Sequence, residues 1–468
     1  MSLASPFALY TRFVSAALFP AQERAKGHVT VAVRRQMEES QWWPHARLEA
    51  LQFERLKALL THGGAYVPYY RKLFADLKFD PASLRSLDDI ARLPFLTKSV
   101  VRANLEALKS ERAGRLDKFN TGGSSGEPLI FFIGAERVSH DVAAKWRATR
   151  WWGVDIGDPE IVVWGSPIEL GAQDRARALR DALFRTELLP AFEMSGAKLD
   201  HFIARIRARR PKMLFGYPSA LSLIARHARK RGIAMNDLGV RVAFVTAERL
   251  YDDQRQVIAE AFGCRVANGY GGRDAGFLAH ECPDGGMHIT AEDVVLEIID
   301  GEGRRLPPGE SGEIIVTHLA TRDFPFIRYR TGDVGVLDDR PCICGRALPL
   351  LKEVQGRTTD FVIAADGTVM HGLALVYVLR ALPGIRQFKI VQESLGLTRV
   401  EVVPEGELSP GTVHQIVAQL KQRLGGGVNV VVETVREIAA ERSGKFRYVV
   451  SNIINQIKVS LFTQNMFP

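Results

Sequence analysis

Between Phe119 and about Leu337, short apolar segments alternate with stretches of helical periodicity. This alternation is typical of an α/β domain, in which helices pack against a sheet. Most of the apolar segments carry almost no polar residues, as expected of strands whose two faces are both covered by helices. The predicted strands are 129–133, 160–163, 213–215, 242–245, 266–267, 295–299 and 313–317, and the predicted helices are 138–151, 199–209, 219–231 and 252–262.

The two ends of the chain follow other patterns. Residues 1–110 form a mainly helical lead-in, because leucines recur at helical spacing between Leu48 and Leu60. After residue 356 the order is strand (388–392), strand (398–403), helix (411–424) and strand (428–435), which predicts a small α+β domain. Since 468 residues exceed what one hydrophobic core usually serves, we predict a large domain over 1–355 and a small domain over 356–468.

Composition excludes several classes of protein. The net charge of +9 is dispersed, and no Lys/Arg tract with interleaved aromatic residues indicates a nucleic-acid surface. No run of about 18 apolar residues is free of charge, so no integral membrane segment is predicted, and residues 7–20 are interpreted as an amphipathic helix docked on the body. Four cysteines in so long a chain fit a reducing cytoplasm better than a disulfide framework.

The segment Asn120–Pro128 combines three glycines with three hydroxyl residues between two apolar runs. Glycine lets a backbone turn tightly, and closely spaced N–H and hydroxyl donors suit phosphate oxygens. By itself the segment is more typical of a Gly/Ser hairpin loop than of a phosphate site. A P-loop kinase or NTPase is disfavoured, because the segment lacks the Gly-Lys-Ser/Thr ending and a strand is predicted to follow it.

Four later motifs also carry polar chemistry. The first, 268–276, follows a predicted strand and combines glycines with an aromatic ring, a cation and a carboxylate. The second, 327–333, ends in an acid that we expect at a turn. The third is 356–360 at the predicted domain boundary, and the fourth is 443–447, a loop that presents a lysine. Each motif alone is typical of a turn, so only their combination and order favour a site.

In this order the five motifs resemble the acyl-adenylate-forming superfamily, and most of all its phenylacetate–CoA ligase and capsular-polysaccharide-biosynthesis branch. The resemblance implies a large α/β domain of several layers and a small, mobile α+β domain. It also implies ATP-dependent adenylation of a carboxylic acid to acyl-AMP with release of pyrophosphate, followed by transfer of the acyl group to a thiol. CoA is the default acceptor, and an amine or hydroxyl group in polysaccharide or secondary-metabolite biosynthesis is the alternative.

The resemblance assigns the nucleotide site residue by residue. Tyr270, followed by Gly271, lies where the family stacks an aromatic ring on adenine, and Asp333 matches the acid that binds the ribose hydroxyls. The segment 246–248 is similar to the family segment beside adenine and the acyl group. The nucleotide-binding residues implied in this way are Thr121, Gly122, Gly123, Ser124, Ser125, Gly126, Thr246, Ala247, Glu248, Tyr270, Gly271, Asp333 and Arg357.

Three residues are implied in catalysis. Lys445 matches the lysine that bridges the acyl carboxylate and the α-phosphate, Arg357 matches the arginine that assists beside the hinge, and Asp274 is the candidate Mg²⁺ ligand. The chain departs from the family at Glu127, where many relatives have lysine, and at Asp274, where the motif has the longer glutamate. These departures leave open a second alternative, an inactive relative that serves as a binding or scaffold protein.

A second metal site is predicted from Cys282, His288, Cys342 and Cys344, since three thiols and an imidazole satisfy tetrahedral zinc. The alternative is that these are reduced cysteines in loops. The sequence identifies neither the acid nor the oligomeric state, for which a homodimer is kept as a candidate.

Overall fold

The computed structural model describes residues 6–121, 129–165, 175–191, 193–354, 361–438 and 448–453. The chain begins with helices, as predicted. Pro68 opens one of them after the extended Val67, at a position where its missing N–H costs no hydrogen bond. These helices are α1 (Pro6–Phe13), α2 (Phe19–Ala25), α3 (Thr30–Ser40), α4 (His45–Tyr66), α5 (Pro68–Leu77) and α6 (Lys98–Ala103), with a π-helical turn at Val14–Leu18 and 3₁₀ turns at Pro81–Ser83 and Leu87–Arg92.

The first helices are docked on the body of the protein, as predicted. Val14 is fully buried, and Thr11 donates a hydrogen bond of 2.8 Å to Asp158 Oδ1. Among the helices that the structure describes, none is both long enough and apolar enough to cross a membrane.

A mixed sheet of 11 strands forms the centre of the molecule. Its strands are β3 (Glu160–Trp164), β4 (Thr186–Pro190), β6 (Met213–Gly216), β7 (Val242–Thr246), β8 (Arg265–Gly272), β9 (Gly276–Glu281), β10 (Met287–Ile289), β11 (Val294–Ile299), β12 (Ser311–His318), β13 (Tyr329–Asp338) and β14 (Leu350–Val354). Their order is β11-β12-β13-β14-β10-β9-β8-β7-β6-β3-β4. A separate hairpin, β1 (Asp117–Asn120) and β2 (Ile130–Ile133), flanks the Gly/Ser-rich segment.

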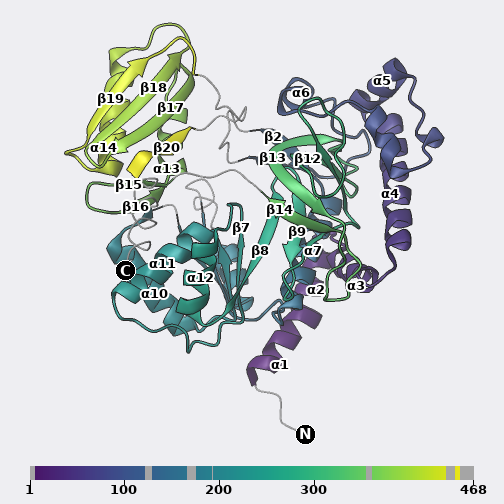
Figure 1. Cartoon of the computed structure of the whole chain (residues 1–468), viewed down its shortest axis with the longest axis horizontal. Helices are drawn as coiled ribbons and strands as arrows, with labels where there is room; N and C mark the ends of the chain where they lie inside the picture. Colours follow the sequence, from purple (N-terminus) through teal and green to yellow (C-terminus); the bar gives the residue numbers. More distant parts are fainter. Residues whose placement is uncertain are drawn as a thin grey trace.

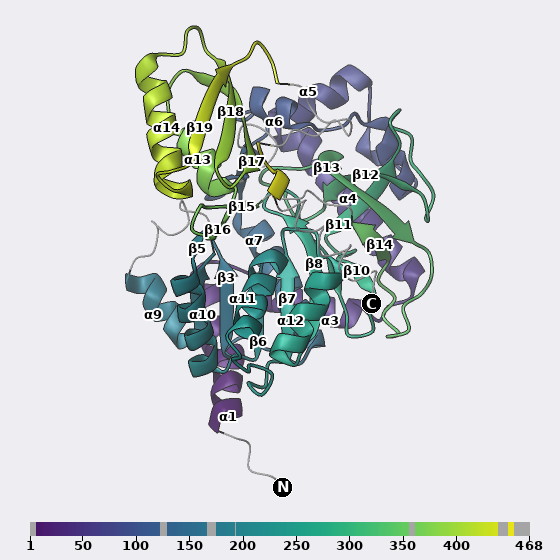
Figure 2. The ribbon, with the colours of Figure 1, turned by 60° about the vertical axis from the view of Figure 1, so that its left-hand side comes forward.

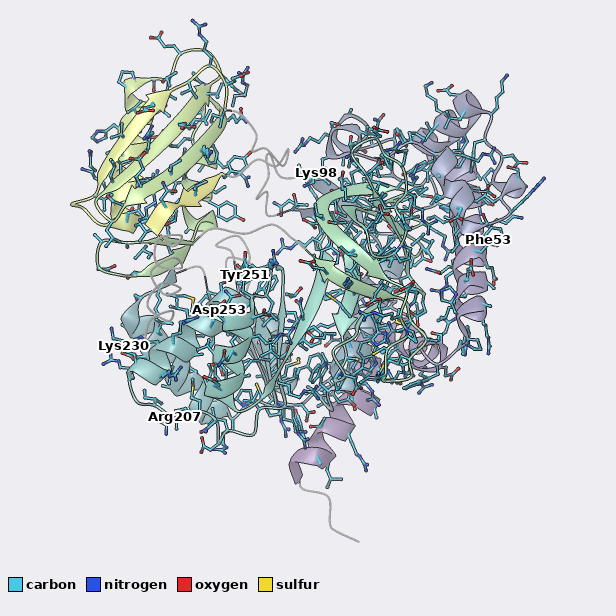
Figure 3. The ribbon with its side chains drawn as sticks, in the orientation of Figure 1. Phe53, Lys98, Arg207, Lys230, Tyr251 and Asp253 are labelled. Carbon is cyan, nitrogen blue, oxygen red and sulfur yellow. The ribbon has the colours of Figure 1, made fainter. Side chains whose placement is uncertain are left out.

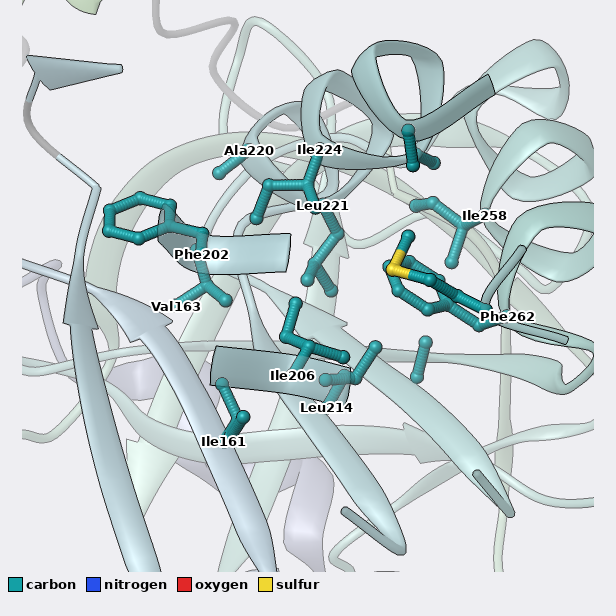
Figure 4. Packing of buried hydrophobic residues seen from close by; sticks show 14 of the residues in the cluster. Ile161, Val163, Phe202, Ile206, Leu214, Ala220, Leu221, Ile224, Ile258 and Phe262 are labelled. Atoms are coloured by element: carbon teal, nitrogen blue, oxygen red, sulfur yellow. The ribbon is translucent and has the colours of Figure 1, made fainter. Parts of the chain in front are cut away.

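The strands from β8 to β4 run parallel and are covered on both faces. The helices α10 (Gly196–Arg209), α11 (Pro218–Lys230) and α12 (Asp252–Phe262) bury a large apolar cluster against one face (Figure 4). On the other face, α7 (Ala135–Trp151) contributes Ala148 to a cluster with Phe215 and Phe244. The helix α9 (Arg175–Leu183) precedes β4. The prediction from the apolar strands is therefore confirmed for β3, β6, β7 and β8, whereas the sequence did not predict β4.

The other half of the sheet is antiparallel, and the sequence predicts only part of it. The hairpin β11–β12 is predicted correctly. Strands β9, β10, β13 and β14 are missed, because their residues do not form an apolar run. β13, for example, reads Tyr-Arg-Thr-Gly-Asp-Val-Gly-Val-Leu-Asp. The pairing partners supply what the local sequence lacks, which is a feature of antiparallel strands with one polar face.

Residues after 361 form a separate lobe, which we call the small lobe (Figures 1 and 2). Its elements are β15 (Phe361–Ile363), β16 (Val369–His371), α13 (Leu373–Arg380), β17 (Ile385–Ser394), β18 (Leu397–Pro404), α14 (Pro410–Leu424), β19 (Asn429–Thr434) and β20 (Val449–Ser451). The predicted strand–strand–helix–strand order is present as β17, β18, α14 and β19. The small lobe has its own apolar cluster, and β16 pairs with β5 (Glu193–Met194) of the large part. The predicted boundary at residue 356 lies outside the described residues.

Candidate active site

The carboxyl ends of the parallel strands face the small lobe. In Figure 3, Tyr251 and Asp253 at the start of α12 lie near that lobe, whereas Arg207 and Lys230, in the last turns of α10 and α11, lie at the opposite end. In parallel β/α units the helix N-termini and the carboxyl ends of the strands share one edge of the sheet. Ligands of open α/β sheets bind at this edge.

The segment 246–248 lies at this edge. Thr246 is the last residue of β7, and Ala247 has a φ of +70°, a left-handed conformation that is costly for a residue with a Cβ. The Glu248 carboxylate accepts hydrogen bonds from the hydroxyl and the backbone N–H of Ser219, in the first turn of α11. A carboxylate is favoured at a helix N-terminus, so Glu248 ties the segment to α11. Strained backbone of this kind clusters at functional sites.

Tyr270 and Asp333 meet although 63 residues separate them, and the Tyr270 hydroxyl donates a hydrogen bond of 3.1 Å to Asp333 Oδ2. Burial and the nearby Asp333 raise the pKa of Tyr270 well above its usual value, so the phenol keeps its proton and acts as a donor. The position of Tyr270 corrects the prediction. Tyr270 and Gly271 lie within β8 and not in a loop after a strand, because β8 runs on to pair with β9.

Asp333 also lies inside a strand, β13, and the predicted turn is wrong. The register between β12 and β13 shifts between Glu313 and Ile315, opposite Gly332, whose φ is +77°. This irregularity is a bulge, which re-aims a side chain without ending the strand. Thr331 stabilises it, since its hydroxyl accepts from Asp333 N at 3.0 Å and donates to Ile314 O at 2.8 Å.

Asp274 occupies the short turn between β8 and β9 and is half-buried. The Tyr329 hydroxyl donates a hydrogen bond of 2.6 Å to Asp274 Oδ2, and Asp274 Oδ1 accepts from Ala275 N at 3.1 Å. Carboxylate oxygens are ligands that Mg²⁺ prefers, and Mg²⁺ is commonly held by one or two carboxylates together with substrate phosphates. The donor chemistry at Asp274 therefore fits a magnesium ion that is shared with a nucleotide.

The remaining predicted nucleotide residues are only partly described. Thr121 closes the β1–β2 hairpin, because its N–H donates to Leu129 O at 3.0 Å and its hydroxyl accepts from Leu129 N at 3.0 Å. The predicted residues that lie outside the described part of the chain are Gly122, Gly123, Ser124, Ser125, Gly126, Glu127, Arg357 and Lys445.

Cys282, His288, Cys342 and Cys344 come together at the end of β9, in β10 and in the loop before β14. Their four ligand atoms lie within 4.8 Å of one another. The Sγ atoms of Cys282 and Cys342 are 3.7 Å apart, and Cys344 Sγ is 3.2 Å from His288 Nε2. Zn–S bonds of about 2.3 Å in a tetrahedron place two sulfur atoms about 3.8 Å apart. The spacing and the chemistry of the four residues therefore fit zinc.

The surroundings of the Cys/His cluster also fit a metal. Burial lowers the pKa of His288 to about 4, so the imidazole is neutral, the form that binds zinc. Its other ring nitrogen, Nδ1, lies 3.3 Å from Leu348 O, and a backbone carbonyl at this place fixes the tautomer of a ligating histidine. Burial raises the pKa of Cys282 to about 12, a value that a bound cation would oppose.

The sequence gives no indication of three residues that contact the site from behind. Tyr329, which orients the Asp274 carboxylate, is one of them. The other two, Arg137 and Asp141, lie on α7 and contact the turn that carries Asp274. A charged pair at positions i and i+4 of a helix usually indicates a solvated face, so only the burial of Arg137 at 1% exposure could reveal the difference.

Comparisons with known proteins agree with this architecture. Residues 362–452 match the family model of the CapK C-terminal domain. The chain is 27% identical to a phenylacetate-coenzyme A ligase of Thermus thermophilus over 444 residues, which cover 91% of this chain and 94% of that protein. It is 25% identical to the protein CapK of Staphylococcus aureus over 369 residues, which cover 78% and 81% of the two chains.

Among solved structures, the chain superimposes on a 2-hydroxyisobutyryl-CoA ligase in complex with 2-HIB-AMP and CoA with a TM-score of 0.64. The sequences are 20% identical, and the match covers 91% of this chain and 96% of that one. The predicted fold class, a large α/β part followed by a small α+β lobe, is thereby confirmed.

Proposed function

We propose that this homologue of the phenylacetate–coenzyme A ligases and of CapK, which has the fold of adenylate-forming ligases, activates a carboxylic acid with ATP. The acid's carboxylate attacks the α-phosphorus of ATP, and the bond to the departing pyrophosphate breaks to leave acyl-AMP. The sulfur of CoA then attacks the acyl carbon, AMP leaves, and the thiol proton is released. The products are an acyl thioester, AMP and pyrophosphate.

The observation that carries this proposal is the convergence of two distant motifs at one edge of the sheet. Tyr270 and Asp333 are joined by a hydrogen bond of 3.1 Å, and Asp274 lies on the same hairpin as Tyr270. An aromatic ring, a carboxylate for ribose hydroxyls and a carboxylate for a metal are the groups that a nucleotide needs. We assign adenine to Tyr270 and the ribose to Asp333.

The reaction requires stabilisation of negative charge on the phosphates. Mg²⁺ supplies compensating positive charge when it is bound, and we assign its binding to Asp274. We assign the phosphates to the segment 121–126, where backbone and hydroxyl donors would hold them. Lys445 is proposed to contact the acyl carboxylate and the α-phosphate, and Arg357 to assist the nucleotide beside the hinge. A fixed ammonium lowers the barrier because it is in place before the charge develops.

We propose that the non-reacting part of the acid lies near Trp164 and Tyr217. These rings are stacked with centroids 4.3 Å apart and planes at 18°, at the carboxyl ends of β3 and β6. Burial and the nearby Glu248 raise the pKa of Tyr217, so its phenol is neutral. An apolar or aromatic acid fits this wall better than a strongly polar one.

The acceptor has one serious alternative. Residues 362–452, which match the CapK C-terminal domain, form the lobe that would meet the acceptor. An amine or hydroxyl group in place of the CoA thiol is therefore kept as a second candidate. Release of AMP that depends on CoA would support the thiol, whereas AMP release that is indifferent to CoA would favour the other acceptors.

Carboxylate-dependent exchange between ATP and labelled pyrophosphate, measured over a library of acids, tests the first step. We expect exchange in wild type and a loss of at least about tenfold in Asp333→Asn, which weakens the contact to the ribose. Asp338→Asn is the matched control, because Asp338 lies on the same strand but pairs with the exposed Arg340. Absence of exchange in wild type across a broad library would overturn the ligase function and favour a scaffold role.

We further propose a structural zinc ion at Cys282, His288, Cys342 and Cys344. The support is the tetrahedral spacing of the four ligand atoms, with no open position left for a substrate. Such an ion would fasten the β9–β10 hairpin to the loop before β14, and β9 carries the turn with Asp274. We place the reaction in the cytoplasm, where ATP and CoA are available and thiols stay reduced.

A further inference from the structure

The helix α7 carries an arginine, Arg137, that is almost fully buried behind Asp274, the candidate Mg²⁺ ligand. Arg137 Nε donates a hydrogen bond of 2.9 Å to Asp141 Oδ2, one helical turn further along. Arg137 Nη2 donates to the backbone carbonyl of Asp274 at 3.3 Å. The guanidinium therefore contacts the β8–β9 turn at the residue whose side chain we assign to magnesium.

Asp141 contacts the start of β9, directly after the same turn. Its Oδ1 accepts a hydrogen bond from Phe277 N at 3.3 Å and lies 3.7 Å from His318 Nε2. Burial alone would raise the pKa of Asp141, but Arg137 and His318 outweigh burial and hold the pKa at about 2. The carboxylate thus stays charged at every pH at which the protein would be assayed.

The turn fits closely against this pair. Gly276 has a φ of +92°, and a Cβ at this position would lie 2.8 Å from Arg137 Nη2, 2.9 Å from Asp141 Oδ1 and 2.9 Å from His318 Cδ2. The backbone between Asp274 and Phe277 is therefore fixed by a glycine that touches the pair and by hydrogen bonds at both ends.

One hydrogen-bond donor of the Arg137–Asp141 pair is left unsatisfied. Within the described residues, Arg137 Nη1 is buried and has no hydrogen-bond partner. A buried donor without a partner destabilises the fold, and an apolar residue at this position would avoid that cost. Arg147 on the same helix also has buried nitrogen atoms without a described partner, so what distinguishes Arg137 is its contact with the turn that carries Asp274.

We propose that Arg137 and Asp141 are positioning residues that set the place of the Asp274 carboxylate for Mg²⁺ and ATP. The proposal rests on the assignment of Mg²⁺ to Asp274 made above. It explains how a carboxylate one methylene shorter than glutamate can serve, since the backbone that carries it is fixed by α7 and its side chain is oriented by Tyr329. α7 begins directly after β2, so the same helix also adjoins the hairpin around the phosphate segment.

The test uses the full chain and measures ATP binding by calorimetry as a function of Mg²⁺ concentration. Arg137→Met removes the charge and both hydrogen bonds while keeping most of the length. Loss of a residue that orients a metal ligand typically weakens metal affinity about 10–100-fold, so we expect the Mg²⁺ concentration for half-maximal ATP binding to rise by that factor. Arg137→Lys, which keeps the charge, should restore part of the loss.

Arg147→Met is the matched control. Arg147 lies on the same helix, is buried to the same extent and forms an ion pair of 2.6 Å with Glu292, but its described hydrogen bonds go to Glu292 and Met37 and not to the hairpin. We expect Arg147→Met to lower the melting temperature and to leave the Mg²⁺ midpoint of ATP binding unchanged. Equal Mg²⁺ midpoints in Arg137→Met and Arg147→Met would overturn the proposal.

Three further outcomes are decisive. If Arg137→Met does not fold, Asp141→Asn is used instead, because it removes the carboxylate charge that faces Arg137 at nearly constant volume. An unchanged Mg²⁺ midpoint of ATP binding in Asp141→Asn overturns the proposal. If wild type binds ATP with Mg²⁺ but no acid supports pyrophosphate exchange, the ligase function fails while the comparison of midpoints still decides the role of Arg137. If Mg²⁺ has no effect on ATP binding by wild type, the positioning proposal fails with it.

Discussion

The variant Gly276→Ala, which adds a single methyl group, tests whether the turn between β8 and β9 positions Asp274. Gly276 has a φ of +92°, and its ideal Cβ position lies within 3 Å of three side-chain atoms, from Arg137, Asp141 and His318. Arg137 and His318 are buried, and Asp141 joins them through a hydrogen bond to Arg137 and a contact of 3.7 Å to His318, so these atoms cannot easily move away. The added methyl group must therefore displace the turn, and with it Asp274.

The expected loss of folding free energy in Gly276→Ala has two parts. A left-handed backbone costs a residue with a Cβ about 1–2 kcal/mol. Overpacking in a site that cannot relax adds about 1–3 kcal/mol, so Gly276→Ala should cost about 2–5 kcal/mol of folding free energy. Gly309 separates the two parts, because it has the same φ of +92° and, among the described residues, no heavy atom within 4 Å of its ideal Cβ. Gly309→Ala should therefore cost only about 1–2 kcal/mol.

The assay combines chemical denaturation with ATP binding in the presence of Mg²⁺. We expect Gly276→Ala to be clearly less stable than Gly309→Ala and to bind ATP more weakly at fixed Mg²⁺, whereas Gly309→Ala binds ATP as wild type does. If the two variants lose the same stability, the contact between Gly276 and the Arg137–Asp141 pair does not constrain the turn. If Gly276→Ala is less stable but binds ATP normally, the turn does not position Asp274 as a ligand for Mg²⁺.

Three other outcomes are expected. Cys342→Ser should reduce bound zinc from about one ion per chain to nearly none and lower the melting temperature, whereas Cys264→Ser should keep the metal; a metal-free wild type would refute the zinc site. Burial opposes the charge of His140, but Asp293 at 2.6 Å outweighs burial and raises its pKa, so the pair stabilises the fold fully below the unfolded pKa of about 6.5 and less as pH rises through the folded pKa. The stability difference between wild type and a His140→Gln variant should therefore shrink as pH rises above about 6.5, and a constant difference would contradict this assignment. Lys445→Ala should slow pyrophosphate exchange about a hundredfold or more while ATP binding changes little, and an equal loss in both would argue against a role in the chemical step.

Most of the parallel half of the sheet, with the exception of β4 and the preceding α9, could be predicted from the sequence because its information is local. Apolar strands buried on both faces and helices with one apolar stripe need no knowledge of the partner. The helix α12, for example, begins and ends where the sequence predicts. The antiparallel half could not be predicted in the same way, since β13 contains Arg330, Thr331 and Asp333 and is recognised only through its pairing with β12 and β14.

The candidate site divides in the same manner. The resemblance of the five motifs implied Tyr270, Asp274 and Asp333, and residue type indicated the four candidate zinc ligands. The sequence placed Tyr270 after a strand and Asp333 at a turn, and both lie within strands. The physical reason is that glycine-rich segments are typical of turns, while here the glycines permit a close β8–β9 pairing and a bulge opposite Glu313.

Periodicity in the sequence by itself predicted an α/β body with a small α+β lobe, whereas the nucleotide site was implied by the resemblance of the five motifs and the zinc site was suggested by residue type. The tertiary structure decided which residues meet. It brought Cys282 and Cys342 to 3.7 Å and Tyr270 and Asp333 to 3.1 Å, and it buried Arg137 against the turn of Asp274. Distances between groups 60 or more residues apart follow from strand order and register, which no local stretch of sequence encodes.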